Sequence, residues 1–184
     1  MIPTAFQTAG PFFPAQFIRP EDHDLTVGRR GERLSGQVIE LEGQVFDGSG
    51  DPMVNAILEL WQADPDGKFP AAGDAFRGWG RTWTDDDGRY RFRTLKPGPY
   101  PVPGQAWTRP PHLSLMVLGS GLMRPLVTQL FFPDEPLNQT DRQLLAVTDP
   151  VARGRLILEP AGPSGVFRFD IRLRGDRETP FLAD

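Results

Sequence analysis

Apolar side chains recur at every second position in several short segments of the chain, and this spacing predicts β-strands. In residues 166–174 (VFRFDIRLR), every second residue from Phe167 to Leu173 is apolar, and charged residues stand between them. In residues 89–95 (RYRFRTL), two aromatic residues and Thr94 alternate with three arginines. Because successive side chains of a strand point to opposite faces, both segments are typical of half-buried strands.

Further segments either alternate in this way or form short apolar runs between turn residues. In residues 54–63, Leu58 and Leu60 are expected on one face, with Glu59 and Trp61 on the other. The sequence predicts further strands at residues 37–46, 81–85, 112–118, 126–132 and 155–158.

An Asp-Asp-Gly turn at residues 86–88 separates the predicted strands 81–85 and 89–95. Two strand segments on either side of such a turn favour a β-hairpin. The runs at 112–118 and 126–132 are apolar enough to be central strands of a sandwich.

One segment, residues 140–147, favours a helix. It starts with Thr140, a residue type that caps helix N-termini, and Leu144 and Leu145 follow at helical spacing. Together with the density of strands and turns, this pattern predicts an all-β, single-domain β-sandwich with one short helix near 140–147.

Residues 1–36 show no sustained period, so the chain divides into an N-terminal arm, 1–36, and a β-sandwich domain, 37–184. The arm carries apolar residues that would be exposed to water if it were free: Phe6, Phe12, Phe13, Phe17 and Ile18. It is therefore expected to pack either on the edge of this chain's own sheet or on a partner chain.

Composition narrows the class of protein further. The 184 residues suit one domain with a substantial core, and the net charge of −4 disfavours a nucleic-acid or anionic-membrane surface. Without cysteine there are no disulfides, thiolate zinc sites or cysteine nucleophiles. Neither a long apolar run nor a signal-peptide pattern is visible, which favours a cytoplasmic location.

Candidate chemistry lies on two segments that proline stiffens. Tyr100 follows Pro97-Gly98-Pro99, and His112 follows two prolines. A phenol and an imidazole held in this way serve either as ligands of a metal ion or as buried hydrogen-bonding groups. The sequence alone leaves both uses open.

Four segments share their residues, order and spacing with one known family. They are residues 41–69 (LEGQVFDGSGDPMVNAILELWQADPDGKF), 84–101 (TDDDGRYRFRTLKPGPYP), 109–115 (RPPHLSL) and 167–175 (FRFDIRLRG). The chain resembles the intradiol ring-cleavage dioxygenases and, within that family, the alpha chains of the protocatechuate 3,4-dioxygenases. This resemblance implies a β-sandwich fold and a role in opening catechol rings with O2.

Catalytic chains of this family hold a non-haem ferric ion with two tyrosines and two histidines. By resemblance, Tyr100 matches the second ligand tyrosine and His112 the first histidine of a His-x-His pair, whose second position here is Ser114. The first ligand tyrosine falls in a stretch where this chain has only Phe69 and Phe76. The resemblance therefore implies that Tyr100 and His112 are vestigial ligand positions and that this chain has no catalytic or metal-binding residue.

In the alpha chains of this family, a Thr-Ala-Gly-Pro segment reaches the active site of a homologous beta chain that binds the Fe(III). Thr8, Gly10 and Pro11 match that segment and are expected to line the partner's substrate pocket. Alternatively, the segment only docks the arm. The resemblance thus implies a non-catalytic subunit, a homologous beta chain as partner, a catechol and O2 as substrates, and a higher-order αβ oligomer.

At two further positions, this chain differs from the family either in the residue itself or in the role that the residue is expected to have. Ser120 stands where some alpha chains carry an arginine near the substrate carboxylate, and Arg124 is a candidate replacement. Arg109 matches an arginine near the iron, and without iron it is expected to form an internal salt bridge or an interface contact. Two alternatives to the subunit hypothesis stay open: a homomeric intradiol dioxygenase with a rearranged iron site, and a stand-alone β-sandwich binding module.

Overall fold

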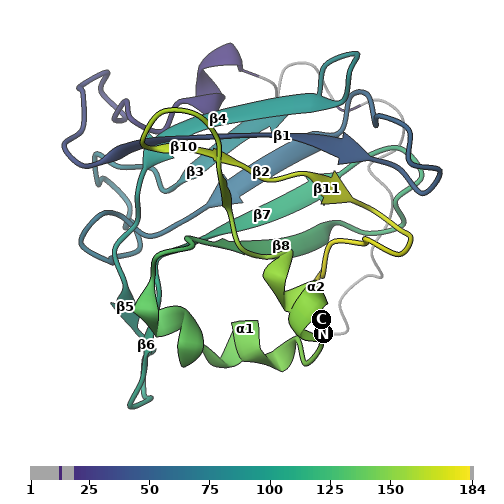
Figure 1. Ribbon diagram of the computed structural model, residues 1–184. Helices are drawn as coiled ribbons and strands as arrows, with labels where there is room; N and C mark the ends of the chain where they lie inside the picture. The colour runs from purple at the N-terminus through teal and green to yellow at the C-terminus, as the bar shows by residue number, and fades with distance from the viewer. Residues whose placement is uncertain (1–12, 14–18, 183–184) are drawn as a thin grey trace, which may run out of the picture.

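The computed structural model describes residues 13 and 19–182, and it shows two β-sheets packed face to face (Figure 1). In the first sheet, β1 is flanked by β4, β10 and β11, and β9 follows β10; the second sheet has the order β3-β2-β7-β8. The strands are β1 Val38–Phe46, β2 Ile57–Trp61, β3 Trp79–Trp83, β4 Arg89–Leu95, β5 Tyr100–Pro101, β6 Thr108–Arg109, β7 His112–Leu118, β8 Leu126–Phe131, β9 Glu159–Pro160, β10 Val166–Arg168 and β11 Ile171–Arg172. The predicted all-β sandwich is confirmed.

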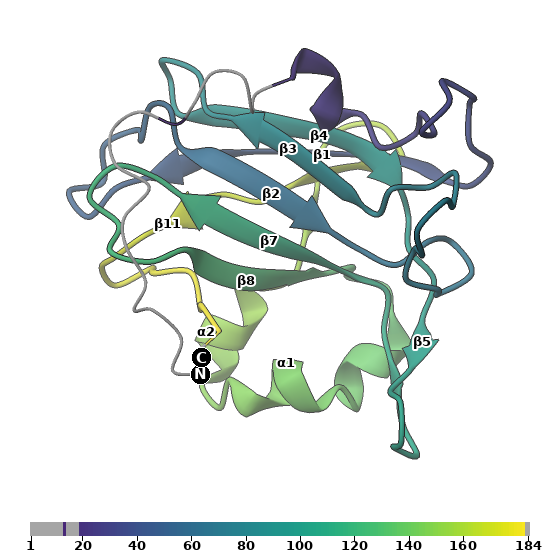
Figure 2. The same cartoon turned by 180° about the vertical axis from the view of Figure 1, so that it is seen from behind.

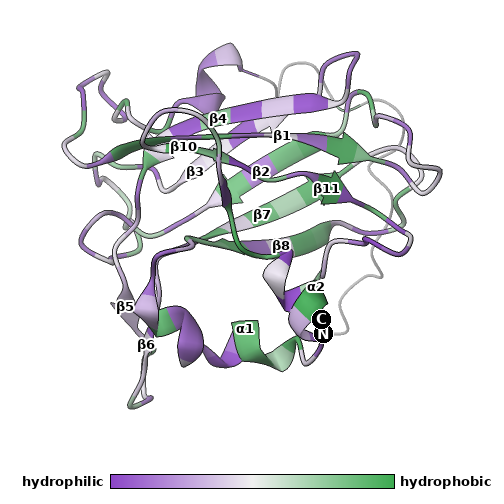
Figure 3. Ribbon diagram, in the orientation of Figure 1, coloured by the Kyte–Doolittle hydropathy of each residue, from purple (hydrophilic) through white to green (hydrophobic). Residues whose placement is uncertain are grey.

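The core between the sheets follows the predicted alternation. Phe92, Leu58 and Leu60 have no exposed surface, whereas Trp61 on the opposite face of β2 is half exposed. Figure 3 shows apolar residues concentrated on β1, β2, β7 and β8, while the arginines of β4 form its polar face. Each fully buried side chain of this size contributes about 1.5–3 kcal/mol relative to an exposed one, so this layer is the main source of stability.

In the part of the chain that the structure describes, four short helices flank the sheets: the 3₁₀ helices η2 Pro20–His23 and η3 Pro136–Gln139, and the α-helices α1 Arg142–Ala146 and α2 Pro150–Gly154. Both α-helices lie beyond β8, which is an edge strand of the second sheet (Figures 1 and 2). The helix predicted near 140–147 is present as α1. Its cap is Asp141, however, and not Thr140, because the Asp141 carboxylate accepts hydrogen bonds from the N–H groups of Gln143 and Leu144.

The predicted hairpin around residues 86–88 is wrong, although the turn itself exists. Asp85 N–H donates to the Arg89 carbonyl at 3.0 Å, and Gly88 N–H donates to the Asp85 carbonyl at 2.9 Å. The strands on either side then part, since β3 pairs with β2 and β4 pairs with β1. The Asp-Gly turn therefore carries the chain from one sheet to the other.

The strand predicted at 155–158 is also wrong. Ile157 forms a single bridge with Phe131, and the N–H groups of Leu156 and Ile157 bond back to the end of α2. Because those donors complete the last turn of α2, they are not free to extend a ladder.

The predicted strand 166–174 is interrupted in its middle, where the side chain of Asp170 accepts a hydrogen bond in place of a backbone carbonyl. Both β10 and β11 run parallel to β1. Between them, the Asp170 carboxylate accepts from Gln44 N–H at 3.1 Å, where a backbone carbonyl would accept in a regular ladder. The Phe169 carbonyl instead accepts from the Tyr90 hydroxyl at 2.6 Å. A Cβ on Gly43 would lie 1.9 Å from that carbonyl oxygen, so this interruption requires glycine there.

Residues before β1 pack on the sandwich. Leu25 is fully buried in the core, and its N–H donates to the Arg93 carbonyl at 2.7 Å. The Asp22 carboxylate is nearly buried and accepts from the Arg77 guanidinium at 2.9 Å. Within the described ranges, no helix has the length and apolar character needed to cross a bilayer.

Candidate functional site

The fold brings Tyr100 and His112 together at the ends of β5 and β7. The Tyr100 hydroxyl oxygen lies 3.4 Å from His112 Nε2, and the two ring centroids are 5.5 Å apart. Pro97 and Pro99 on one segment and Pro110 and Pro111 on the other restrict the backbone on both sides. We call this pair, with its immediate neighbours, the Tyr100–His112 site.

Hydrogen bonding and burial fix the protonation of His112. Its Nδ1 lies 2.8 Å from the Pro110 carbonyl oxygen, which can only accept, so Nδ1 carries the proton and the Nε2 lone pair faces Tyr100. The ring also stacks on Phe131. Burial, followed by the positive charge of Arg109, lowers the pKa of His112 to about 4. The imidazole is therefore neutral at pH 7.

A buried ion pair between Arg109 and Asp141 lies next to this site. Arg109 Nε donates to Asp141 Oδ2 at 2.8 Å, and its Nη2 donates to Asp141 Oδ1 at 3.2 Å and to Gln129 Oε1 at 2.8 Å. Arg109 is 4% exposed and Asp141 is fully buried. Since Asp141 also caps α1, this network ties β6, β8 and α1 together. Of the two roles expected of Arg109, an internal salt bridge or an interface contact, the structure shows the internal salt bridge.

The residues that the resemblance sets against the other two ligands differ in chemistry from a tyrosine and a histidine. Phe69 packs edge-on against Tyr100, with ring centroids 4.9 Å apart, whereas Phe76 is buried in the core. Ser114 lies two residues after His112 on the same face of β7, and its hydroxyl is 3.5 Å from Gln129 Nε2. Phe69 offers no donor atom to a metal, and Ser114 offers only a neutral hydroxyl.

Other candidate residues lie away from this site. His23 is on η2, where its Nδ1 contacts the Pro20 carbonyl at 2.5 Å. Tyr90 belongs to the core, as expected, and burial raises its pKa well above the usual value. Thr8, Gly10 and Pro11 lie outside the described residues.

The loop between β7 and β8 carries Ser120 and Arg124 at the far end of β7 from His112. The strand His112–Leu118 separates them by about 20 Å, at roughly 3.3 Å per residue. Neither residue therefore contacts the Tyr100–His112 site of the same chain.

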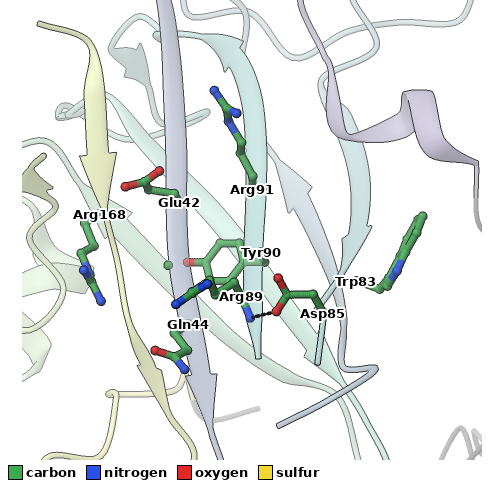
Figure 4. Close-up of a pocket in the computed structure, with 9 residues that line it drawn as sticks. Glu42, Gln44, Trp83, Asp85, Arg89, Tyr90, Arg91 and Arg168 are labelled. Atoms are coloured by element: carbon green, nitrogen blue, oxygen red, sulfur yellow. Dashed lines mark hydrogen bonds between the residues drawn. The ribbon is translucent and has the colours of Figure 1, made fainter. Parts of the chain in front are cut away.

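A surface depression, lined mainly by β1 and β4 of the first sheet, gathers several charged side chains (Figure 4). Neither Tyr100 nor His112 is among the residues that line it. The lining arginines already have acidic partners: Arg89 pairs with Asp87, Arg91 with Glu40 and Arg168 with Asp170. Over the part of the chain that the structure describes, no three His, Cys, Asp or Glu side chains gather closely enough to hold a metal ion.

Comparisons with known proteins agree with this architecture. A family model described as "Dioxygenase" matches residues 8–175. The chain is 38% identical to the protocatechuate 3,4-dioxygenase beta chain of Burkholderia cepacia, over 92% of this chain and 79% of that protein. It is 32% identical to the alpha chain of the same organism, over 97% of this chain and 96% of that protein.

A solved structure extends the similarity to three dimensions. The dioxygenase domain of a dioxygenase and carbohydrate-binding protein fusion from Streptomyces sp. SirexAA-E superposes with a TM-score of 0.60 and 31% identity. The superposition covers 94% of this chain and 98% of that domain. The sequence match through nearly the whole chain and the shared sandwich lead to one conclusion: the chain belongs to the intradiol ring-cleavage dioxygenase family.

Proposed function

We propose that this chain is a non-catalytic, alpha-type subunit of a heteromeric protocatechuate 3,4-dioxygenase. In this role it completes the substrate pocket of a homologous beta chain, which binds Fe(III). The complex cleaves protocatechuate between its hydroxyls with O2, giving 3-carboxy-cis,cis-muconate. The observation that carries the proposal is the composition of the Tyr100–His112 site.

The residues of that site do not fit a ferric centre. Such a centre in this family needs two phenolates and two imidazoles, and only Tyr100 and His112 offer those groups here. The two side chains lie at hydrogen-bonding distance from each other, and Phe69 packs against Tyr100. A phenol, a neutral imidazole and a serine hydroxyl provide too few strong donors for Fe(III), which prefers anionic oxygen ligands.

Overall sequence similarity supports the proposal of a partner subunit, but it does not decide whether this chain is of the alpha or the beta type. Its relatives include both an alpha and a beta chain of one enzyme, and the identity to the beta chain is the higher of the two, 38% against 32%. The ligand positions favour the alpha role, because a beta chain that binds iron would need donors where Phe69 and Ser114 stand.

The proposed contribution of this chain to catalysis is to shape the partner's pocket. Thr8, Gly10 and Pro11 are proposed to line it, since Gly10 permits close approach of backbone to a flat ring and Pro11 stiffens the turn. Ser120 and Arg124 lie too far from this chain's own Tyr100–His112 site to serve it. If either binds the substrate carboxylate, it does so in the pocket of a partner.

This proposal is tested by co-expressing the chain with a homologous chain of the same genome that carries all four ligand residues. Oxygen uptake with protocatechuate is expected from the purified complex and from neither chain alone. Within the complex, Tyr100→Phe in this chain should leave turnover within about twofold, whereas the matching Tyr→Phe change in the partner should abolish it. Turnover by this chain alone, or its loss on Tyr100→Phe, would contradict the proposal.

A further inference from the structure

We propose that a depression between the end of α2 and β11 binds a small oxyanion with two or more negative charges, either a phosphate or a short polycarboxylate. Neither Tyr100 nor His112 lines this depression, and the inference does not depend on the proposed function. The observation that carries it is a group of arginines that outnumbers the acidic residues beside them.

The lining of the depression is positively charged, although the whole chain has a net charge of −4. The volume is about 220 Å³, which suits a small ligand. The charged residues that line it are four arginines and two acids: Arg155, Arg168, Arg172, Arg177, Glu159 and Asp170. All six side-chain types are ionised at neutral pH, so the arginines leave an excess of positive charge. A depression of this sign attracts anions.

Both acids lie beside the same arginine. Asp170 pairs with Arg168 at 3.2 Å, and Glu159 is directly opposite Arg168 in the ladder between β9 and β10. Asp176 and Glu178 are near in sequence, but they are not among the lining residues. Within the described ranges, three lining arginines form no ion pair with a carboxylate: Arg155, Arg172 and Arg177.

Uncharged groups orient two of these three guanidinium groups. Arg155 donates through Nη1 to the Glu178 carbonyl at 3.1 Å and through Nη2 to the Asp176 carbonyl at 2.9 Å. Arg172 Cζ lies 4.1 Å from the centroid of the Phe46 ring. A carbonyl oxygen or an aromatic face orients a guanidinium but leaves it with its full positive charge. Each guanidinium has five N–H donors, so both retain donors for an anion.

A reversal of the chain at residues 175–178 brings the third arginine to the depression. Gly175 begins the reversal with φ of +102°, a conformation that glycine adopts at little cost. After it, Thr179 N–H donates to the Arg172 carbonyl, and Arg172 N–H donates to the Thr179 hydroxyl, each at 3.0 Å. Arg177 therefore lines the same depression as Arg172.

The geometry of guanidinium groups selects the class of ligand. A guanidinium binds two oxygens of a carboxylate or a phosphate along its edge, which a chloride ion does not offer. Three such groups favour an anion with several charged oxygens. Because they come from the end of α2, from β11 and from the turn at 175–178, the bound anion should join these segments and stabilise the folded chain.

The first experiment is isothermal titration calorimetry of the full chain with two probes, inorganic phosphate and citrate, at an ionic strength held constant with sodium chloride. At least one probe should bind with a Kd of about 1 mM or lower. Tighter binding of phosphate would identify a phosphate site, and tighter binding of citrate would identify a polycarboxylate site. If neither probe binds at this level, the proposal is wrong.

Three variants test whether the arginines form the site. Arg172→Gln and Arg177→Gln should each raise the Kd about tenfold or more, as expected for losing charge-assisted hydrogen bonds. Arg172→Lys keeps the charge but not the planar fork, so its Kd should lie between those of wild type and Arg172→Gln. The matched control is Arg89→Gln, which removes an exposed arginine paired with Asp87 outside the depression and should keep the wild-type Kd. Arg177 is exposed, so Arg177→Gln remains informative if Arg172→Gln does not fold.

Thermal unfolding then separates a binding site from a general salt effect. Phosphate and similar salts stabilise many folded proteins because they are excluded from the surface, and that effect should be equal in all variants. A probe at a hundred times its Kd should raise the Tm of wild type and Arg89→Gln by about 5–10 °C, and that of the Arg172→Gln and Arg177→Gln variants by about half as much or less. An equal rise in all four proteins would overturn the proposal.

Discussion

Removing the Asp141 carboxylate should destabilise the chain far more than removing an ordinary helix cap. Asp141 is fully buried, binds Arg109 through two hydrogen bonds and caps α1. In Asp141→Ala, Arg109 keeps its charge in a buried site without a counterion, which costs about 3–5 kcal/mol. The lost cap adds about 1 kcal/mol. We therefore expect a loss of roughly 4–6 kcal/mol, a large share of the 5–15 kcal/mol that stabilises a typical domain.

The chain offers a matched control for this prediction. Asp149 caps α2 by accepting from Val151 N–H at 3.0 Å, and it lies at an exposed position. Asp149→Ala should cost only about 1 kcal/mol. The difference between the two variants therefore isolates the buried ion pair. Asp141→Asn should fall between them, because an amide oxygen can still cap α1 but carries no charge.

Urea unfolding followed by tryptophan fluorescence measures these free energies, with the slope m as a check that the unfolded states are comparable. Thermal unfolding should show a fall in Tm of about 2–4 °C per kcal/mol for a chain of this size. If Asp141→Ala costs no more than Asp149→Ala, the Arg109–Asp141 pair does not stabilise the fold and our account of it is wrong.

Three further predictions concern the core and the Tyr100–His112 site. Between pH 6.5 and 4 the unfolded chain binds a proton on His112 that the folded chain does not, so the free energy of unfolding should fall by about 3 kcal/mol as the pH falls. Urea unfolding across this range should show a shallower fall in His112→Gln; equal falls would contradict the lowered pKa. Tyr90→Phe leaves the Phe169 carbonyl without its partner and should cost about 1–3 kcal/mol in the same assay, whereas no loss would show that water replaces the hydroxyl. Phe69→Tyr with Ser114→His supplies the two donor types that the site lacks, and metal analysis should find ferric ion in the double variant but not in either single one; failure of the double variant would place the missing ligand elsewhere.

Local patterns predicted the strands, because burial on one face imposes a period of two. The alternation in β4 and β2 needed no knowledge of the fold. Which strands pair with each other was harder to predict. The Asp-Gly turn before Arg89 has the same sequence signature whether it closes a hairpin or carries the chain between sheets. The predicted cap of α1, Thr140, was wrong because threonine and aspartate both cap helices and the two residues are adjacent. Asp141 serves as the cap in a position that also binds Arg109.

The candidate site was predictable only where a motif marked it. Tyr100 and His112 stand in recognisable proline-rich segments, and the structure brings them together, as their match to two ligand positions of the family implied. The ion pair between Arg109 and Asp141 joins residues that are 32 positions apart, so no periodic pattern in the sequence predicts it. Likewise, nothing in the sequence distinguishes Phe69, which touches Tyr100, from Phe76, which is buried in the core.

Iron should be measured first in the full chain, expressed without a partner in iron-supplemented medium. A non-catalytic alpha-type subunit should contain far less than one ferric ion per chain and show no visible absorption band of a ferric phenolate. Co-purification with the homologous chain that carries all four ligands should then bring in one ferric ion per pair of chains. One tightly bound ferric ion in the isolated chain would refute the non-catalytic role, and Tyr100 and His112 would have to be ligands after all.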